Sequence, residues 1–141
     1  MRYWQKRKVK MTSIVEAKPY GLIKSQLEKS DEISISLCKT CPSFMDIGEE
    51  EMNQLAERLK KDGFNVIGMG ATPIACSFPV VVKTQKNLRG NTIVVLGCDA
   101  HVYNLKRCFP HRKIIPALTT LGLGAIDGDG SLHVVKRHKE Y

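Results

Sequence analysis

The stretch TIVVLGCDAHVYNLKRCF, residues 92–109, places an apolar run directly before an amphipathic segment. Such a short apolar run is typical of a strand buried on both faces of a parallel sheet. Asp99 suits the N-cap of a helix after the run, because its carboxylate accepts a hydrogen bond from a free backbone N–H group. The inner face of that helix would carry Val102, Leu105 and Phe109. The stretch therefore predicts one strand–helix unit of an α/β fold.

Strand-like and helix-like segments also alternate along the rest of the chain. We expect further strands at residues 33–37, 64–69, 113–118 and, at the edge of the sheet, 132–135, and helices after Pro19, over residues 47–62 and from Pro79. The valines after Pro79 favour a strand, but a helix is expected there because parallel neighbours need a crossover. The alternation predicts a single α/β domain, flavodoxin-like or Rossmann-like. Its mostly parallel open sheet would have roughly four to five strands and helices on both faces.

The composition is that of one globular domain. The chain has 141 residues, of which 43% are hydrophobic and 26% are charged. No apolar stretch is long enough for a membrane-spanning helix, and no apolar region follows the basic start as it would in a secretory signal. We therefore expect a cytoplasmic protein without membrane contact, with a basic N-terminal arm at residues 1–12 and one α/β domain at residues 13–141.

The net charge of +8 is concentrated at the two ends of the chain. Five of the first ten residues are lysine or arginine, and residues 136–140 add further positive charge. A nucleic-acid interface would interleave basic residues with exposed aromatics, but aromatic residues make up only 6% of the chain. We therefore interpret the start as a solvated arm, and not as a nucleic-acid interface.

Four of the five cysteines follow expected strands. Cys38 and Cys41 form a C-x-x-C after the first strand, Cys76 comes after the second, and Cys98 closes the third. In a strand order of 2-1-3-4 the first and third strands are neighbours, and sites form outside the carboxyl ends of strands at such a point. We therefore expect these four thiols to converge at one edge of the sheet. Cys108 lies roughly 15 Å further along a helix and is expected to pack there alone.

Converging thiols allow three interpretations. Four soft thiolates select zinc or an iron–sulfur cluster, and scattered ligands with only one close pair are compatible with a [4Fe–4S] cluster. A C-x-x-C beside a βαβ pattern is also found in redox-active dithiols, which here would use Cys38 and Cys41. Free cysteines are, finally, common as small core residues in a reducing compartment. The spacing favours one metal site and leaves the other two interpretations open.

Five segments resemble a known family by their motifs and their order. They are ISLCKTCPSF (35–44), GEEEMNQLAERLKKDGFNVIG (48–68), PIACSF (73–78), VVLGCDAHVYNLKRCFP (94–110) and KIIPALTTLGLGAI (113–126). With the lead-in AKPYGLIKSQLEKS (17–30), they are similar to the MetV-type family, which is also called the methylenetetrahydrofolate reductase C-terminal domain family. The segment from Val94 to Gly124 carries most of the likeness, because it pairs a strand–Cys–small turn with the later FP-x-x-x-I-x-P-x-L run.

The resemblance implies a metal-binding accessory protein of one-carbon metabolism, which passes electrons towards a flavin-containing methylenetetrahydrofolate reductase subunit. It carries over Cys38, Cys41, Cys76 and Cys98 as ligands of one [4Fe–4S] cluster or one Zn²⁺. Longer members continue into a cysteine-rich segment, whereas this sequence has no cysteine after residue 108, so one site is expected. His101 stands where the family has a small residue. We expect it to be exposed on its helix or, alternatively, to tune the metal through a hydrogen bond.

Other motifs give no sign of catalytic machinery. Neither Gly68-x-Gly70 nor Gly122-x-Gly124 has the third glycine of a dinucleotide-binding loop. Asp127 and Asp129 begin like a calcium loop but lack its glutamate, so they predict a turn. His111 and His133 have no second ligand at a suitable spacing and are expected at the surface. We therefore expect a non-catalytic accessory or electron-transfer subunit, although the sequence does not decide whether the chain is an enzyme.

Overall fold

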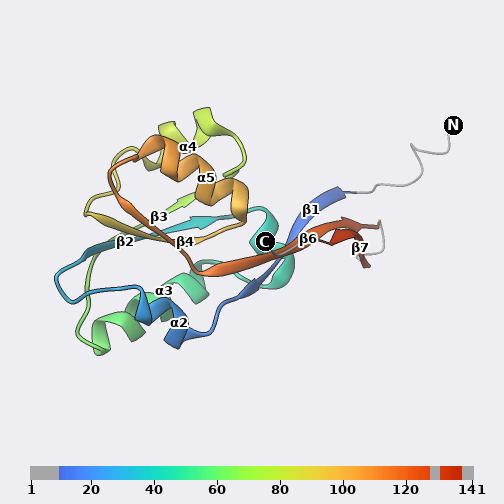
Figure 1. Ribbon diagram of the computed structural model, residues 1–141. Helices are drawn as coiled ribbons and strands as arrows, with labels where there is room; N and C mark the ends of the chain where they lie inside the picture. The colour runs from blue at the N-terminus through green and yellow to red at the C-terminus, as the bar shows by residue number, and fades with distance from the viewer. Residues whose placement is uncertain (1–9, 128–130, 138–141) are drawn as a thin grey trace, which may run out of the picture.

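The computed structural model describes residues 10–127 and 131–137 (Figure 1). In chain order the elements are β1 (Lys10–Ala17), α2 (Tyr20–Ser25), β2 (Glu32–Cys38), the 3-10 helix η1 (Cys41–Met45), α3 (Glu49–Lys61), β3 (Asn65–Thr72), α4 (Phe78–Gln85), β4 (Thr92–Leu96), α5 (Asp99–Cys108), β5 (Lys113–Pro116), β6 (Leu118–Ile126) and β7 (Leu132–Arg137). Four strands form an all-parallel sheet in the order β3-β2-β4-β5. The other three form a separate antiparallel sheet in the order β1-β6-β7. The fold is therefore mixed α/β with two sheets.

The parallel sheet has the strand order that the sequence analysis used to group the cysteines. Its central strand β2 places Ile35 beside Met69 of β3 on one side and beside Val94 of β4 on the other. Almost every residue of β2 and all residues of β4 are buried, as expected for strands that are covered on both faces. The prediction of a parallel sheet with this order is confirmed.

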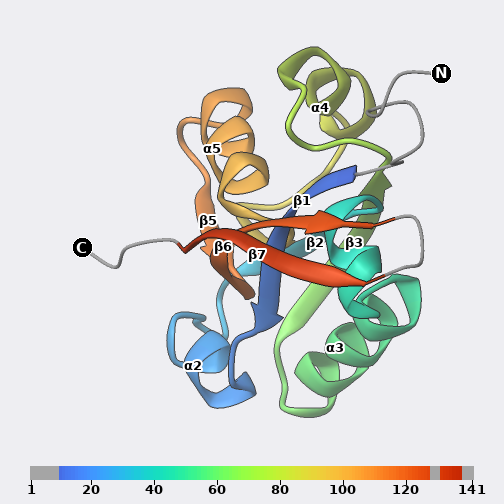
Figure 2. The ribbon, with the colours of Figure 1, turned by 90° about the vertical axis from the view of Figure 1, so that its right-hand side faces the viewer.

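Helices cover both faces of the parallel sheet (Figures 1 and 2). On one face, Met52 and Leu59 of α3 belong to a buried cluster together with residues of α2 and β2. On the other face, Val81 of α4 and Leu105 of α5 belong to a second cluster. The helix expected from Pro79 is α4, in which this proline lies in the first turn and loses no backbone hydrogen bond.

The antiparallel sheet was not expected, and it corrects two predicted strands. The strand predicted at 113–118 is split, because the chain leaves the parallel sheet at Ala117, whose N–H donates to the carbonyl of Val95 at 2.8 Å, and continues as β6. The strand predicted at 132–135 is β7, and it pairs with β6 instead of extending the parallel sheet. Both differences arise because the pattern of a single strand does not show which sheet it joins.

The N-terminal strand changes the extent of the expected basic arm. β1 begins at Lys10, so residues 10–12 belong to a strand that pairs with β6. The rest of the expected arm, residues 1–9, lies outside the described residues. The segment KMTSIVEA contains the β-branched residues Thr12, Ile14 and Val15, which favour a strand. The strand that it pairs with, β6, is more than one hundred residues away in the sequence. A strand with so distant a partner gives no local hairpin signal.

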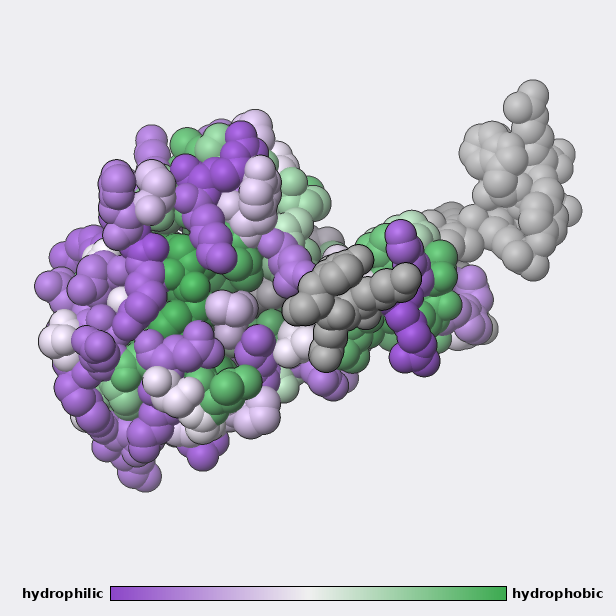
Figure 3. Space-filling view, viewed as in Figure 1, coloured by the Kyte–Doolittle hydropathy of each residue, from purple (hydrophilic) through white to green (hydrophobic). Residues whose placement is uncertain are grey.

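The antiparallel sheet projects from the body of the protein (Figure 1). Its surface carries apolar side chains (Figure 3), and four of these are each exposed by 44% or more, namely Met11, Leu123, Val134 and Val135. Every described residue of β7 is exposed. Apolar surface gathered on one element is characteristic of an interaction site.

Candidate metal centre

Cys38 and Cys98 stand at the carboxyl ends of two neighbouring strands. Cys38 is the last residue of β2, and Cys98 follows β4 by two residues as the N-cap of α5. Leu37 of β2 pairs with Leu96 of β4, so the two strands end at the same level. Both cysteines are buried, with exposed fractions of 4% and 8%. Asp99, the expected N-cap, instead lies in the first turn of α5 because the cap is one residue earlier.

The Cys38 thiol is enclosed by groups from three segments. Burial raises the pKa of this thiol, while the backbone N–H groups of Thr40 and Ala75 donate to its Sγ and lower the pKa. The nearby charges of Cys41 and Cys98 raise it further because like charges disfavour the thiolate. The net shift is upward. Cys41 and Cys98 are thus within the electrostatic range of Cys38.

Cys41 links this edge to the antiparallel sheet. It is the first residue of η1 and is partly buried. The backbone N–H of Ser13, in β1, donates to its Sγ at 3.4 Å. The contribution of β1 to the site was not expected, because nothing in the spacing connects Ser13 with a cysteine so far along the chain. The strand therefore supplies a wall of the site that the sequence did not reveal.

Cys76 lies in a loop that hydrogen bonds hold close to Cys38. The side chain of Cys76 itself is exposed. Ala75, the preceding residue, bonds Cys38 through its N–H and accepts a hydrogen bond from Asn104 Nδ2 at 2.8 Å. The Thr40 hydroxyl donates to the carbonyl of Pro73 in the same loop. Within residues 10–127 and 131–137, no three Cys, His, Asp or Glu side chains are arranged as a metal site requires.

Cys108 occupies the other end of α5, as its last residue. It is partly buried against the cluster that contains Val102 and Leu105. Burial raises the pKa of its thiol, and the positive charge of Arg112 opposes that rise. The length of α5 separates Cys108 from Cys98, but the cluster that Cys108 packs against also contains Cys38, so its separation from all four predicted ligands stays a prediction.

His101 is fully buried, so the expectation of an exposed helix residue is wrong. It lies on the face of α5 that also carries Leu105, one turn away, and both side chains have an exposed fraction of 0%. Its Nε2 lies 2.9 Å from the hydroxyl oxygen of Ser36 in β2. Gly97 leaves room for the ring, because a Cβ at that position would overlap the imidazole. The signal that the sequence analysis missed is this glycine, one helical turn before the histidine.

The buried imidazole is part of a polar chain across the sheet face. Ser36 donates to Gln85 Oε1 at 2.7 Å, and Gln85 Nε2 donates to the Thr84 carbonyl at 3.2 Å. Ser36 has one hydroxyl proton and donates it to Gln85. In the contact with His101 the Ser36 oxygen must therefore accept, and His101 Nε2 carries the proton and donates. His101 Nδ1 then carries a lone pair, and it has no hydrogen-bond partner among the described residues. Burial lowers the pKa of His101 to about 4, which keeps the ring neutral.

His111, His133 and Asp127 lie at the surface of the described part of the chain. His111 is exposed, and His133 Nε2 lies 2.7 Å from Asp127 Oδ2 at the surface, where both side chains are at least 43% exposed. Asp129 lies outside the described residues. The surface location predicted for the two histidines is confirmed.

The four cysteines at or near the carboxyl edge are of the donor type that a soft metal takes, but the described side chains are not arranged around one metal position. Cys38 and Cys98 end or follow neighbouring strands, Cys41 begins η1, and Cys76 lies on the adjacent loop, although the Cys38 and Cys98 side chains belong to different buried clusters. Zinc and [4Fe–4S] clusters both take four thiolates. The amino-terminal end of α5, a helix of ten residues, begins at this edge, and its dipole stabilises negative charge on thiolates.

Comparisons with known proteins identify no relative. No protein-family model matches the chain, and no curated protein or solved structure gives a significant match. The likeness to the MetV-type family thus stays a prediction from motifs. Among the described residues, no helix combines the length and the apolar character needed to cross a membrane.

Proposed function

We propose that this chain is a metal-binding accessory protein that holds one [4Fe–4S] cluster or one Zn²⁺ through Cys38, Cys41, Cys76 and Cys98. The observation that carries the proposal is the shared environment of the Cys38 thiol. Cys41 and Cys98 act on its charge, and Ala75, next to Cys76, donates to its sulfur. Cys38 and Cys98 stand where two neighbouring parallel strands end, which is the edge at which sites form in open α/β sheets.

The protein's own residues would shape the centre in specific ways. Cys38 and Cys98 are buried and would hold the metal away from water, whereas Cys76 is exposed and would complete the site from the loop. A bound cluster would supply one-electron redox chemistry, and zinc would supply only a structural crosslink. The backbone N–H groups of Thr40, Ala75 and Ser13 donate to cysteine sulfurs and would stabilise the thiolate ligands.

The dithiol alternative is disfavoured by the surroundings of Cys38. A redox-active C-x-x-C needs a reactive thiolate, and such thiols have a lowered pKa. Burial instead raises the pKa of Cys38, and only 4% of the residue is exposed. A structural zinc site fits the same four cysteines, and the contact of β1 with Cys41 suggests that it would tie the two sheets together.

For the partner, we propose a flavin-containing reductase subunit related to methylenetetrahydrofolate reductase, in the cytoplasm. This follows from the family resemblance alone. The projecting antiparallel sheet, with its exposed Met11 and Val135, offers a surface for that contact. Measured activity of such a reductase with and without this protein would separate an electron-transfer role from a structural one.

The test of metal binding is analysis of the protein purified without oxygen. About four iron and four sulfide per chain, with a broad visible absorption, would identify a cluster, whereas one zinc per chain would identify a structural site. Cys38→Ser should lose the metal in either case. A protein that stays metal-free after anaerobic reconstitution would refute the proposal.

A further inference from the structure

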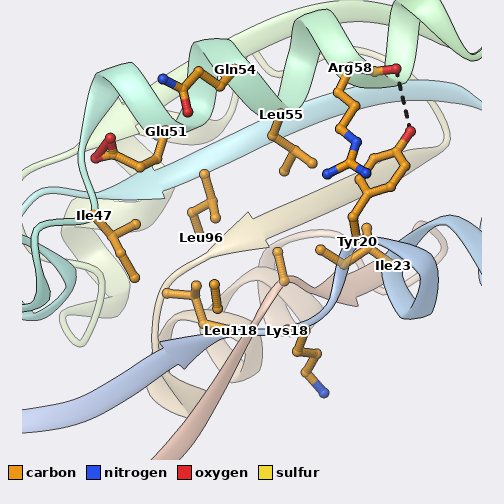
Figure 4. Close-up of a pocket in the computed structure, with 12 residues that line it drawn as sticks. Lys18, Tyr20, Ile23, Ile47, Glu51, Gln54, Leu55, Arg58, Leu96 and Leu118 are labelled. Atoms are coloured by element: carbon orange, nitrogen blue, oxygen red, sulfur yellow. Dashed lines mark hydrogen bonds between the residues drawn. The ribbon is translucent and has the colours of Figure 1, made fainter.

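A cavity of about 250 Å³ lies on the α3 side of the parallel sheet, and its lining contains no cysteine. Its apolar lining comes from Ile23, Ile47, Leu55, Leu96, Ala117 and Leu118. Figure 4 shows five of these side chains, Ile23, Ile47, Leu55, Leu96 and Leu118, around a common space between α3 and the segment that leads from β1 into α2. The volume is slightly below the usual range for ligand pockets, roughly 300–1,000 Å³. The cavity is thus suited to a compact molecule.

One cationic group reaches this cavity. The guanidinium of Arg58 extends from α3 into the space beside Leu55 (Figure 4), and its Cζ lies 3.8 Å from the centre of the Tyr20 ring. Stacking on the ring holds the guanidinium plane in place. Lys18 also lines the cavity, but Figure 4 shows its amine pointing away.

The acidic groups around Arg58 are engaged elsewhere. Asp62 accepts a hydrogen bond from the Tyr20 hydroxyl and forms an ion pair with Lys24 at 3.6 Å. Glu51 accepts a hydrogen bond from the backbone N–H of Gly48 at 2.7 Å. Burial and the Asp62 hydrogen bond raise the pKa of Tyr20 to about 12, so the phenol is neutral. No carboxylate in the described part of the chain pairs with Arg58.

The walls of the cavity are held in place without a ligand. The backbone N–H of Lys18 donates to the Ala117 carbonyl at 2.9 Å, which joins the β1–α2 turn to the β5–β6 turn. Ile23, Leu96 and Leu118 are buried members of the adjoining core. A largely apolar space with an exposed guanidinium stacked in its lining suits a molecule that combines an apolar body with an anionic group.

From this geometry we propose that the cavity binds a small monocarboxylate with an apolar body, whose carboxylate pairs with Arg58. The apolar body would lie against Leu55, Leu96 and Leu118. The guanidinium presents parallel N–H donors that match the two carboxylate oxygens. This proposal goes beyond metal binding and does not depend on it, because no cysteine lines the cavity.

The direct test is an NMR titration of the isotope-labelled full chain with 3-phenylpropionate and with its neutral amide. The acid should bind saturably in the millimolar range and shift the amide signals of Tyr20, Leu55 and Ala117. The amide should bind at least about tenfold more weakly, because it lacks the charge that pairs with the guanidinium. Equal binding of the two compounds, or no saturable shift with either, would overturn the proposal.

Variants locate the carboxylate. Arg58→Gln should weaken binding of 3-phenylpropionate by about tenfold or more. Lys61→Gln is the matched control, because it removes the same charge from the same helix but from a residue that does not line the cavity. Leu55→Trp fills the space and should abolish binding while Arg58 is retained. Equal effects of Arg58→Gln and Lys61→Gln would show general charge attraction and would refute the assigned anchor.

Discussion

Acidification tests the buried state of His101 directly. The ring has an exposed fraction of 0%, and its Nε2 is committed as the donor to Ser36. Its pKa is lowered by burial from 6.5 to about 4. In the unfolded chain the same imidazole is in water and takes up a proton with an ordinary pKa.

The sign and size of the effect follow from these two pKa values. The folded pKa is lower than the unfolded one, so the unfolded chain binds more protons between them and stability falls as the pH falls. The stabilisation is complete above about pH 6.5 and is lost progressively down to about pH 4. The slope is about 1.4 kcal/mol per pH unit within that window. Between pH 7 and pH 5, His101 should therefore account for a loss of about 2 kcal/mol.

The assay is urea unfolding at pH 7, 6 and 5 for the wild type and for His101→Gln. Glutamine cannot titrate, so the difference in pH dependence between the two proteins isolates the imidazole. We expect the wild type to lose about 2 kcal/mol more than the variant between pH 7 and pH 5. If both proteins lose the same free energy of unfolding over that range, the buried neutral histidine is refuted, whatever the stability of the variant at pH 7.

Three further substitutions test single contacts by the free energy of unfolding at pH 7. Gly97→Ala would put a methyl group into the space of the buried imidazole and should cost about 3 kcal/mol; a loss below 1 kcal/mol would contradict the tight fit. Asn104→Ala leaves the carbonyl of Ala75 without its donor and should cost about 1–3 kcal/mol, whereas unchanged stability would mean that the loop is not held there. Tyr20→Phe removes the hydrogen bond to Asp62 and should lower the stability slightly, and an unchanged free energy of unfolding would mean that this bond does not stabilise the fold.

The parallel half of the fold could be predicted because its signals are local. Residues 92–109 contain a strand and the helix that follows it, and both appear as β4 and α5. The antiparallel half could not be predicted in the same way. β1 and β6 pair residue 10 with residue 126, and no turn or spacing marks a contact between segments so far apart.

The burial of polar residues in the sheet is a second feature that could not be predicted from the sequence. Ile33, Ile35 and Leu37 alternate with serines, which in many strands would mean that one face meets water. Here both faces are covered. Ser36 is 0% exposed, and its hydroxyl is satisfied by hydrogen bonds with Gln85 and His101. The sequence showed the strand but not the polar chain that crosses its covered face.

The positions of Cys38 and Cys98 in the candidate site could be predicted from local strand signals, but the orientation of Cys76 could not. The strand order brings Cys38 and Cys98 to one edge, since both follow central parallel strands. The orientation of Cys76 depends on how its loop is fastened by Thr40 and Asn104. Such contacts come from side chains on other elements, so the exposed position of Cys76 could not be read from its spacing.

The most direct test of the central claim is the metal content per chain of the five single cysteine-to-serine variants, purified side by side without oxygen. Cys38→Ser, Cys41→Ser, Cys76→Ser and Cys98→Ser should each lose most of the metal, because each removes one soft ligand. Cys108→Ser should keep the wild-type metal content and cost at most about 1–2 kcal/mol of stability. If Cys108→Ser empties the site while Cys76→Ser leaves it filled, the proposed ligand set is wrong.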